Sequence, residues 1–148
     1  MNFIPLYKLL PELSAEIRTV TLMRPRPGLP SGKYYFTESF CGKQGCDCRR
    51  AYIDAYPADM LESGVLGTPL ATINFGWESA AFYRRWMGGP LSAEDLANIM
   101  GPALAWGQPQ SPCAEALLEL FEFLLEDDAY IDRIIRHYRL FRQALKRS

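Results

Sequence analysis

The sequence has little of several features that would point to a function at once. Its 148 residues include a single histidine, His137, which excludes metal sites built from several histidines. The formal net charge is only −1, so the basic excess typical of a general nucleic-acid binder is missing. No apolar run approaches the ~20 residues that a membrane-spanning helix needs. We therefore expect a soluble protein that engages neither nucleic acid nor a membrane.

The N-terminus lacks the features of a secretion signal. No basic residue precedes the first apolar residues, and Pro5 and Pro11 interrupt them. We therefore expect a cytoplasmic protein with reduced cysteines, a setting in which closely spaced thiols favour metal over disulfides. The sequence also lacks the Gly-x-Ser-x-Gly, His-Glu-x-x-His and dinucleotide-binding motifs, so it names no reaction. The partner, a protein or a small molecule, and the oligomeric state are left open.

Length and residue pattern predict one α+β domain over residues 1–148. Alternating and aromatic-rich segments predict a small, mostly antiparallel sheet, with strands at 18–23, 33–40, 50–56 and 69–75. Helical periodicity predicts a short, Pro-interrupted helix at 5–17. Periodicity and capping residues also predict a helical C-terminal half, with helices at 78–87, 92–100, 113–125 and 129–144, that ends in an α-hairpin. Residues 58–68 are expected to form a long turn, and residues 103–110 an irregular segment.

The last two predicted helices carry opposite charge. The acidic residues of the first are Glu115, Glu119, Glu122 and Glu126. The basic residues of the second are Arg133, Arg136, Arg139, Arg142, Lys146 and Arg147. We expect the two solvated faces to pair across the α-hairpin, and a basic stripe that binds phosphates is the alternative.

The segment from Cys41 to Arg50 places three of the four cysteines within eight residues, between two predicted strands. Cys46 and Cys48 point to the same side of an extended chain, because side chains alternate. The glycines of Gly42-Lys43-Gln44-Gly45 permit the reversal that brings Cys41 over that pair. Three thiolates suit zinc, so the spacing predicts a structural zinc knuckle at the tip of a β-hairpin. The alternatives are free thiols, or a redox pair of Cys46 and Cys48.

Zinc in a structural site takes four ligands, so one ligand is missing from the knuckle. His137 lies beside an apolar helical stripe and should face the interior of the domain, which favours it as the fourth ligand. Cys113 lies in the first turn of its predicted helix, where the helix dipole favours the thiolate, and is the second candidate. Water is the third, and with water in that position the knuckle could be catalytic.

Arg49 and Arg50 follow the cysteines directly. A zinc ion with three thiolates and one neutral ligand carries a net charge of −1, which a neighbouring guanidinium can compensate. The alternative is a patch, with Lys43 and nearby tyrosines, that binds an anion or single-stranded nucleic acid. Compensation is the simpler interpretation.

The knuckle from Cys41 to Arg50 resembles the short cysteine knuckles of SEC-C-type bacterial proteins, which are small zinc modules usually appended to other domains. This chain has Cys-x4-Cys-x-Cys, whereas that family has Cys-x-Cys followed by a distant Cys-His or Cys-Cys pair. The resemblance covers the knuckle alone, and it implies zinc and a bacterial origin without implying an activity.

The sequence thus predicts a structural zinc site with the ligands Cys41, Cys46, Cys48 and His137, in a protein that serves as a binding or adaptor module. The alternative is a thiol-dependent or zinc-dependent enzyme that uses the cysteine cluster or Cys113. In that case Cys113 and His137 form the one nucleophile–base pair that the sequence offers.

Overall fold

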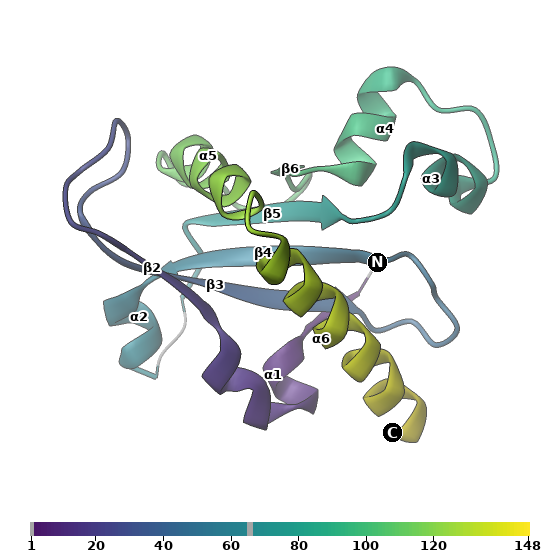
Figure 1. Ribbon diagram of the computed structural model, residues 1–148, viewed down its shortest axis with the longest axis horizontal. Helices are drawn as coiled ribbons and strands as arrows, with labels where there is room; N and C mark the ends of the chain where they lie inside the picture. The colour runs from purple at the N-terminus through teal and green to yellow at the C-terminus, as the bar shows by residue number, and fades with distance from the viewer. Residues whose placement is uncertain (1, 65–66) are drawn as a thin grey trace.

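The structure is a computed structural model that describes residues 2–64 and 67–148. Strands dominate its first half and helices its second (Figure 1). The elements in chain order are β1 (Phe3–Pro5), α1 (Leu6–Leu9), the 3₁₀ helix η1 (Pro11–Glu16), β2 (Arg18–Leu22), β3 (Gly32–Cys41), β4 (Arg50–Pro57), α2 (Ala58–Glu62), β5 (Ala71–Gly76), α3 (Ala80–Met87), α4 (Ala93–Met100), β6 (Ala103–Leu104), α5 (Ala114–Leu124) and α6 (Asp128–Arg147). The predicted α+β class is confirmed.

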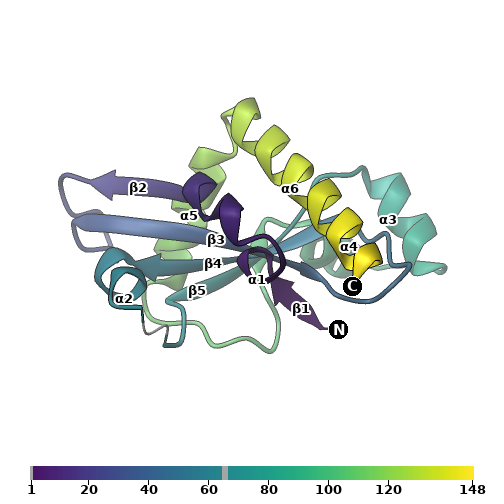
Figure 2. The same ribbon diagram turned by 90° about the horizontal axis from the view of Figure 1, so that it is seen from below.

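All six strands form one antiparallel sheet, and β2, β3, β4 and β5 run side by side in it (Figure 2). The order along the sheet is β1-β3-β4-β5-β6, and β2 also pairs with β3. β2 pairs with residues 32–36 of the long strand β3, whereas β1 pairs with residues 39–41. The N-terminal strand therefore lies directly against the end of β3 where the cysteine knuckle begins.

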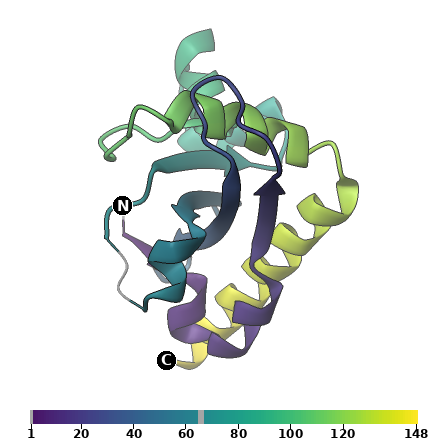
Figure 3. The ribbon, with the colours of Figure 1, turned by 90° about the vertical axis from the view of Figure 1, so that its left-hand side faces the viewer.

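One face of the sheet carries the apolar core, and α5 and α6 cover that face (Figures 1 and 3). Alternate residues of the central strands point into it: Phe36 and Phe40 from β3, Ile53 from β4, and Ile73 and Phe75 from β5. Removing these side chains from water is the main stabilising contribution of the sheet. The knuckle at the end of β3 is therefore attached to a well-packed frame.

The opposite face of the sheet is polar, and α4 covers part of it, next to β5 and the edge strand β6. Arg50, Tyr52 and Asp54 of β4 alternate with the core residues, and so do Thr72 and Asn74 of β5. Arg50, Thr72 and Asn74 are nevertheless almost fully buried. Buried polar side chains on a sheet face need partners, so this face holds a network rather than a solvated surface.

The structure departs from the predicted elements mainly where segments are short. Residues Ala58–Glu62 form helix α2 rather than part of a long turn. The sequence does not reveal this helix because five residues are too few to show a helical period. Val65 and Leu66 of the predicted turn lie outside the described residues. Strands β1 and β6 are also too short to show alternation. Within the described residues, no helix is long and apolar enough to cross a bilayer.

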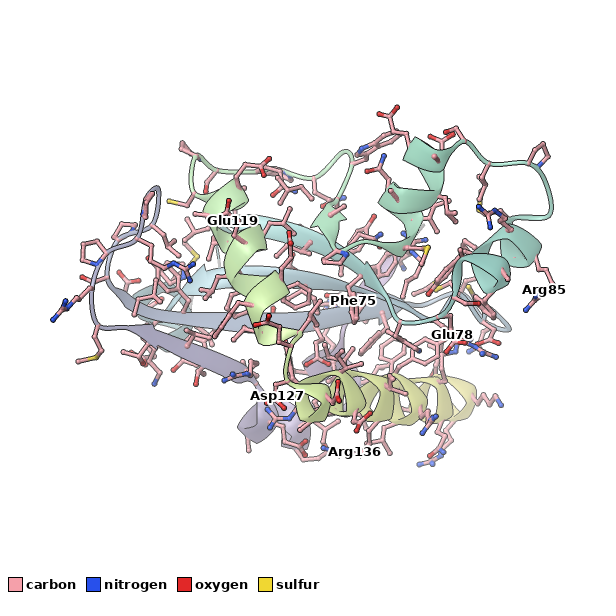
Figure 4. All side chains as sticks on the ribbon, turned by 45° about the horizontal axis from the view of Figure 1, so that its top comes forward. Phe75, Glu78, Arg85, Glu119, Asp127 and Arg136 are labelled. Carbon is pink, nitrogen blue, oxygen red and sulfur yellow. The ribbon has the colours of Figure 1, made fainter. Side chains whose placement is uncertain are left out.

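Helices α5 and α6 meet at a short turn but then diverge, so they do not lie side by side (Figure 3). The predicted pairing of their acidic and basic faces is therefore wrong: within residues 2–64 and 67–148, no ion pair joins α5 to α6. Glu119 of α5 and Arg136 of α6 are well apart in Figure 4. Arg136 pairs with Glu16 of η1 instead. The ion pair of this basic residue of α6 is thus with the N-terminal half of the chain and not with α5.

Candidate metal centre

The structure brings the three clustered cysteines together at the tip of the β3–β4 hairpin. Cys41 ends β3, and Cys48 lies two residues before β4 begins. The sulfurs of Cys41, Cys46 and Cys48 all lie within 4.8 Å of one another. A tetrahedral zinc site with Zn–S bonds of ~2.3 Å needs sulfurs roughly 3.8 Å apart, so small side-chain movements suffice to close it. The cluster can hold a metal ion.

The turn between Cys41 and Cys46 has the geometry that its glycines predict. The N–H of Cys46 donates to the carbonyl oxygen of Lys43 at 3.2 Å, which closes a β-turn. Gly45 has a φ of +77°, a value that the third position of such a turn often needs and that a side chain disfavours. A side chain on Gly42 would collide with Ile4, so this glycine lets β1 pass close to the knuckle.

The sulfurs of Cys41 and Cys48 lie in a setting that suits metal-bound thiolates better than free ones. Both residues are fully buried, and Cys46 is partly exposed. Burial raises the pKa of Cys41 and raises the pKa of Cys48 to about 12. The backbone N–H of Lys43 bonds Cys41 and that of Arg50 bonds Cys48, and each bond favours the thiolate. A bound cation would stabilise the two thiolates and so allow these thiols to ionise at neutral pH.

Arg49, which follows the last cysteine of the knuckle, has an unusual backbone conformation. Its φ of +49° is the only positive value outside glycine among the described residues. Two tyrosines hold its backbone: its N–H donates to the Tyr138 hydroxyl at 3.4 Å, and its carbonyl accepts from the Tyr83 hydroxyl at 2.7 Å. Its side chain pairs with Asp47 at 2.8 Å and with Glu78 at 3.3 Å. A left-handed residue that is tied down by helices α3 and α6 fixes the direction in which Cys48 points.

Helix α6 also forms hydrogen bonds with the first half of the knuckle. Arg142 donates from Nη1 to the carbonyl oxygen of Cys41 at 2.9 Å and from Nη2 to that of Lys43 at 3.1 Å. Gln44 donates from its side chain to the carbonyl oxygen of Leu145 at 2.8 Å. The charge of Arg142 also lowers the pKa of Cys41, against the stronger effect of burial. The guanidinium placed to compensate a negative charge on the cluster is therefore that of Arg142, about 100 residues from the cysteines in sequence.

Arg49 and Arg50, which the sequence predicts as the compensating charges, are engaged elsewhere. Two carboxylates neutralise Arg49. The Arg50 guanidinium lies on the polar sheet face, where its Nε and Nη2 donate to Asn74 Oδ1 at 3.1 and 2.8 Å. These arginines therefore do not form the exposed basic patch that an anion or single-stranded nucleic acid would need.

His137, the predicted fourth ligand, does not join the cysteines. It is fully buried, as the apolar stripe of its helix indicates, but both ring nitrogens face carboxylates. Nδ1 lies 2.8 Å from Glu38 Oε1, and Nε2 lies 3.1 Å from Glu16 Oε1. An imidazole binds a metal through a nitrogen lone pair, so ligation would require one of these contacts to break.

Cys113, the second candidate, lies at the far end of the sheet. It lines a hollow with Tyr34 and Pro57, at the start of β3 and the end of β4. Tyr34 and Cys41 are seven steps apart along the extended strand β3, which corresponds to about 23 Å. Cys113 is therefore too far away to complete the cluster, and it is also not assembled with His137 as a nucleophile–base pair.

Comparison with known protein families, curated proteins and solved structures finds no match to this chain. The resemblance of the knuckle to SEC-C-type modules stays a prediction. What the chain does must therefore be inferred from the chemistry of its own residues.

The contacts of His137 form a second ionisable cluster that the sequence only hinted at. Burial disfavours the imidazolium, but the hydrogen bonds and charges of Glu38 and Glu16 outweigh it and raise the pKa of His137. Hydrogen bonds from Arg136 and His137 lower the pKa of Glu16. In its protonated form the imidazole donates from Nδ1 to Glu38 and from Nε2 to Glu16. Glu38 could have been found from the sequence, because it falls at every second position with Tyr34, Phe36 and Phe40 and so points into the core.

We expect the apparent pKa of His137 to lie above the ~6.5 of a free histidine and to fall in the variant Glu16→Gln. Because the folded-state pKa is raised, this group stabilises the fold fully below pH ~6.5 and loses that contribution as the pH rises through the folded pKa. His137 is the only histidine, so a ¹H–¹³C NMR titration reports it as a single imidazole signal. Glu12→Gln, in the same short helix, is the matched control. A pKa at or below 6.5 in the wild type would contradict the assignment.

Proposed function

We propose that Cys41, Cys46 and Cys48 bind one zinc ion, and that this ion has a structural role in a cytoplasmic binding module. The observation that carries the proposal is the convergence of three sulfurs within 4.8 Å at a hairpin tip. Thiolate-rich sites select zinc among the common divalent ions, and zinc is redox-inert. The ion would hold the tip of the β3–β4 hairpin in the shape in which Arg142 of α6 bonds its backbone and its own Gln44 bonds Leu145 of α6.

Water is the fourth ligand that best suits the arrangement. Two carboxylates occupy the ring nitrogens of His137, and Cys113 lies at the far end of the sheet, whereas Cys46 leaves one side of the cluster partly exposed to solvent. A catalytic zinc–water site would also need a nearby general base. The adjacent carboxylate, Asp47, is held by three hydrogen bonds from Arg49 and accepts a fourth from Tyr138 at 3.3 Å. This arrangement favours structure over catalysis.

The thiol-enzyme alternative is less well supported. A reactive cysteine needs a lowered pKa and solvent access, whereas Cys41 and Cys48 are fully buried and their pKa values are raised. A disulfide between Cys46 and Cys48 would be strained across a single intervening residue, and all four cysteines are free. A metal-bound cluster accounts for the three sulfurs together.

Metal analysis combined with thiol titration tests the proposal. We expect about one zinc per chain in protein purified without added metal, and Cys113 as the one thiol that reacts rapidly with a disulfide reagent. After chelation and denaturation, all four cysteines should react. Cys113→Ser should keep its zinc, whereas Cys46→Ser should lose most of it. Metal-free wild-type protein with three or four rapidly reacting thiols would overturn the proposal.

A further inference from the structure

A pocket of about 250 Å³ lies on the polar face of the sheet, between β4, β5, β6 and helix α4. Its lining includes Arg50, Asn74 and Asp95 as polar groups and Met87, Ile99 and Trp106 as apolar ones. Small-molecule sites typically measure ~300–1,000 Å³, so an occupant of this pocket would be small. The zinc knuckle does not use this pocket.

The pocket contains a buried cation with unused hydrogen-bond capacity. Arg50 is only 9% exposed. Of the five N–H groups of its guanidinium, Asn74 Oδ1 takes two, one from Nε and one from Nη2. The outer edge, formed by Nη1 and the second N–H of Nη2, makes no hydrogen bond with any residue of the described chain, and Arg50 forms no ion pair there. A charge buried in this way is costly, and a bound anion would offset that cost.

The guanidinium is also held in a fixed orientation. The Asn74 amide donates from Nδ2 to the carbonyl oxygens of Asn98 at 2.6 Å and Ile99 at 2.9 Å, near the C-terminal end of α4. Its Oδ1 is thereby turned toward Arg50. The Arg50 Cζ atom lies 5.8 Å from the centre of the Trp86 ring, which supports the guanidinium further. Binding an anion would therefore order little that is not already ordered.

The other walls of the pocket indicate the rest of the occupant. Leu91, Ile99 and Leu104 make the wall largely apolar. Two large apolar side chains in the lining are unusually exposed: Trp106 at 70% and Met87 at 47%. Exposed aromatic and methionine side chains at a pocket are typical of a site that covers an apolar ligand.

We propose that this pocket binds a small organic carboxylate with an apolar body, held bidentately by the outer edge of Arg50. Two parallel N–H groups match the two oxygens of a carboxylate. The exposed carboxylate of Asp95 also lines the pocket and would repel a phosphate dianion or a nucleic-acid strand more strongly than a monoanion. The inference goes beyond the zinc proposal, because none of the cysteines lines the pocket.

Titration of the wild-type protein with phenylacetate, monitored by NMR, tests the proposal. We expect phenylacetate to shift the Trp106 indole, the Met87 methyl and the Arg50 Nε signals. Phenylacetamide has the same shape without the charge, and its affinity should be lower by a factor of about ten or more. Inorganic phosphate should not shift these signals. Equal binding of the acid and the amide, or shifts confined to other parts of the chain, would overturn the proposal.

Arg50→Gln should abolish the preference for the acid, and Arg50→Lys should weaken it because a single ammonium cannot bind bidentately. Arg85→Gln is the matched control: Arg85 lies on α3 and points away from the molecule (Figure 4), so its loss should leave binding unchanged. If the Arg50 variants do not fold, the comparison of phenylacetate with phenylacetamide in the wild type still shows whether the pocket prefers a carboxylate. The zinc content of the same sample, measured separately, distinguishes a failure of carboxylate binding from a failure of zinc binding at the knuckle.

Discussion

Removing the proposed zinc ion is expected to lower the midpoint of thermal unfolding by roughly 10 °C, and Cys48→Ser is expected to do the same without a chelator. The binding free energy of a structural metal contributes directly to folding stability. The loss should be about 3–5 kcal/mol, and for a chain of this length each kcal/mol shifts the midpoint by about 2–4 °C. The fold should survive, because Cys41, Cys46 and Cys48 are not part of its main apolar core.

Differential scanning fluorimetry of the zinc-loaded, chelated and zinc-restored protein measures this effect. Cys113→Ser serves as the control, since that cysteine is remote from the cluster and only partly buried. Hydrogen exchange should accelerate on chelation at the hairpin tip, residues 42–49, and at the end of α6, where Arg142 and Gln44 join them. An unchanged midpoint in protein from which zinc has demonstrably been removed would show that the ion has no structural role.

The knuckle could be predicted because its information is local. The alternation of β3 and β4, the glycines of the turn and the spacing of Cys41, Cys46 and Cys48 all lie within a short segment. Each of these patterns specifies geometry over a few residues. The longer strands and helices were predictable for the same reason, whereas β1, β6 and α2 are too short to carry a pattern.

What holds the knuckle could not be predicted, because it depends on which helix crosses which strand. Arg142 reaches the carbonyl of Cys41 only because α6 crosses the face of β3. His137 was correctly expected to face the interior, but periodicity shows only that a side chain is buried and not what it contacts. The sequence places Arg50 with the cysteines because it is near them along the chain. The alternation of β4 instead turns its side chain toward Asn74.

The second large effect is expected at the buried pair of Glu38 and His137. Both side chains are fully buried and lie 2.8 Å apart. Removing one partner leaves the other polar group buried without its main contact, which typically costs about 3–5 kcal/mol. We therefore expect Glu38→Leu and His137→Leu each to lower the free energy of unfolding by that amount. The double variant should recover much of the loss, because two apolar side chains can fill a core position without needing partners.

Urea unfolding of the wild type, the two single variants and the double variant at pH 7 forms a complete mutant cycle. Glu119→Leu is the control for the change of side chain alone, since Glu119 is exposed on α5 (Figure 4) and its loss should stay within about 0.5 kcal/mol. Glu16 also contacts His137 but is partly solvated, so Glu16→Gln should cost less than the loss of Glu38. Additive losses in the double variant would show that Glu38 and His137 stabilise the fold independently. A strong recovery would show that the losses in the single variants arise from the partner that is left buried without its contact.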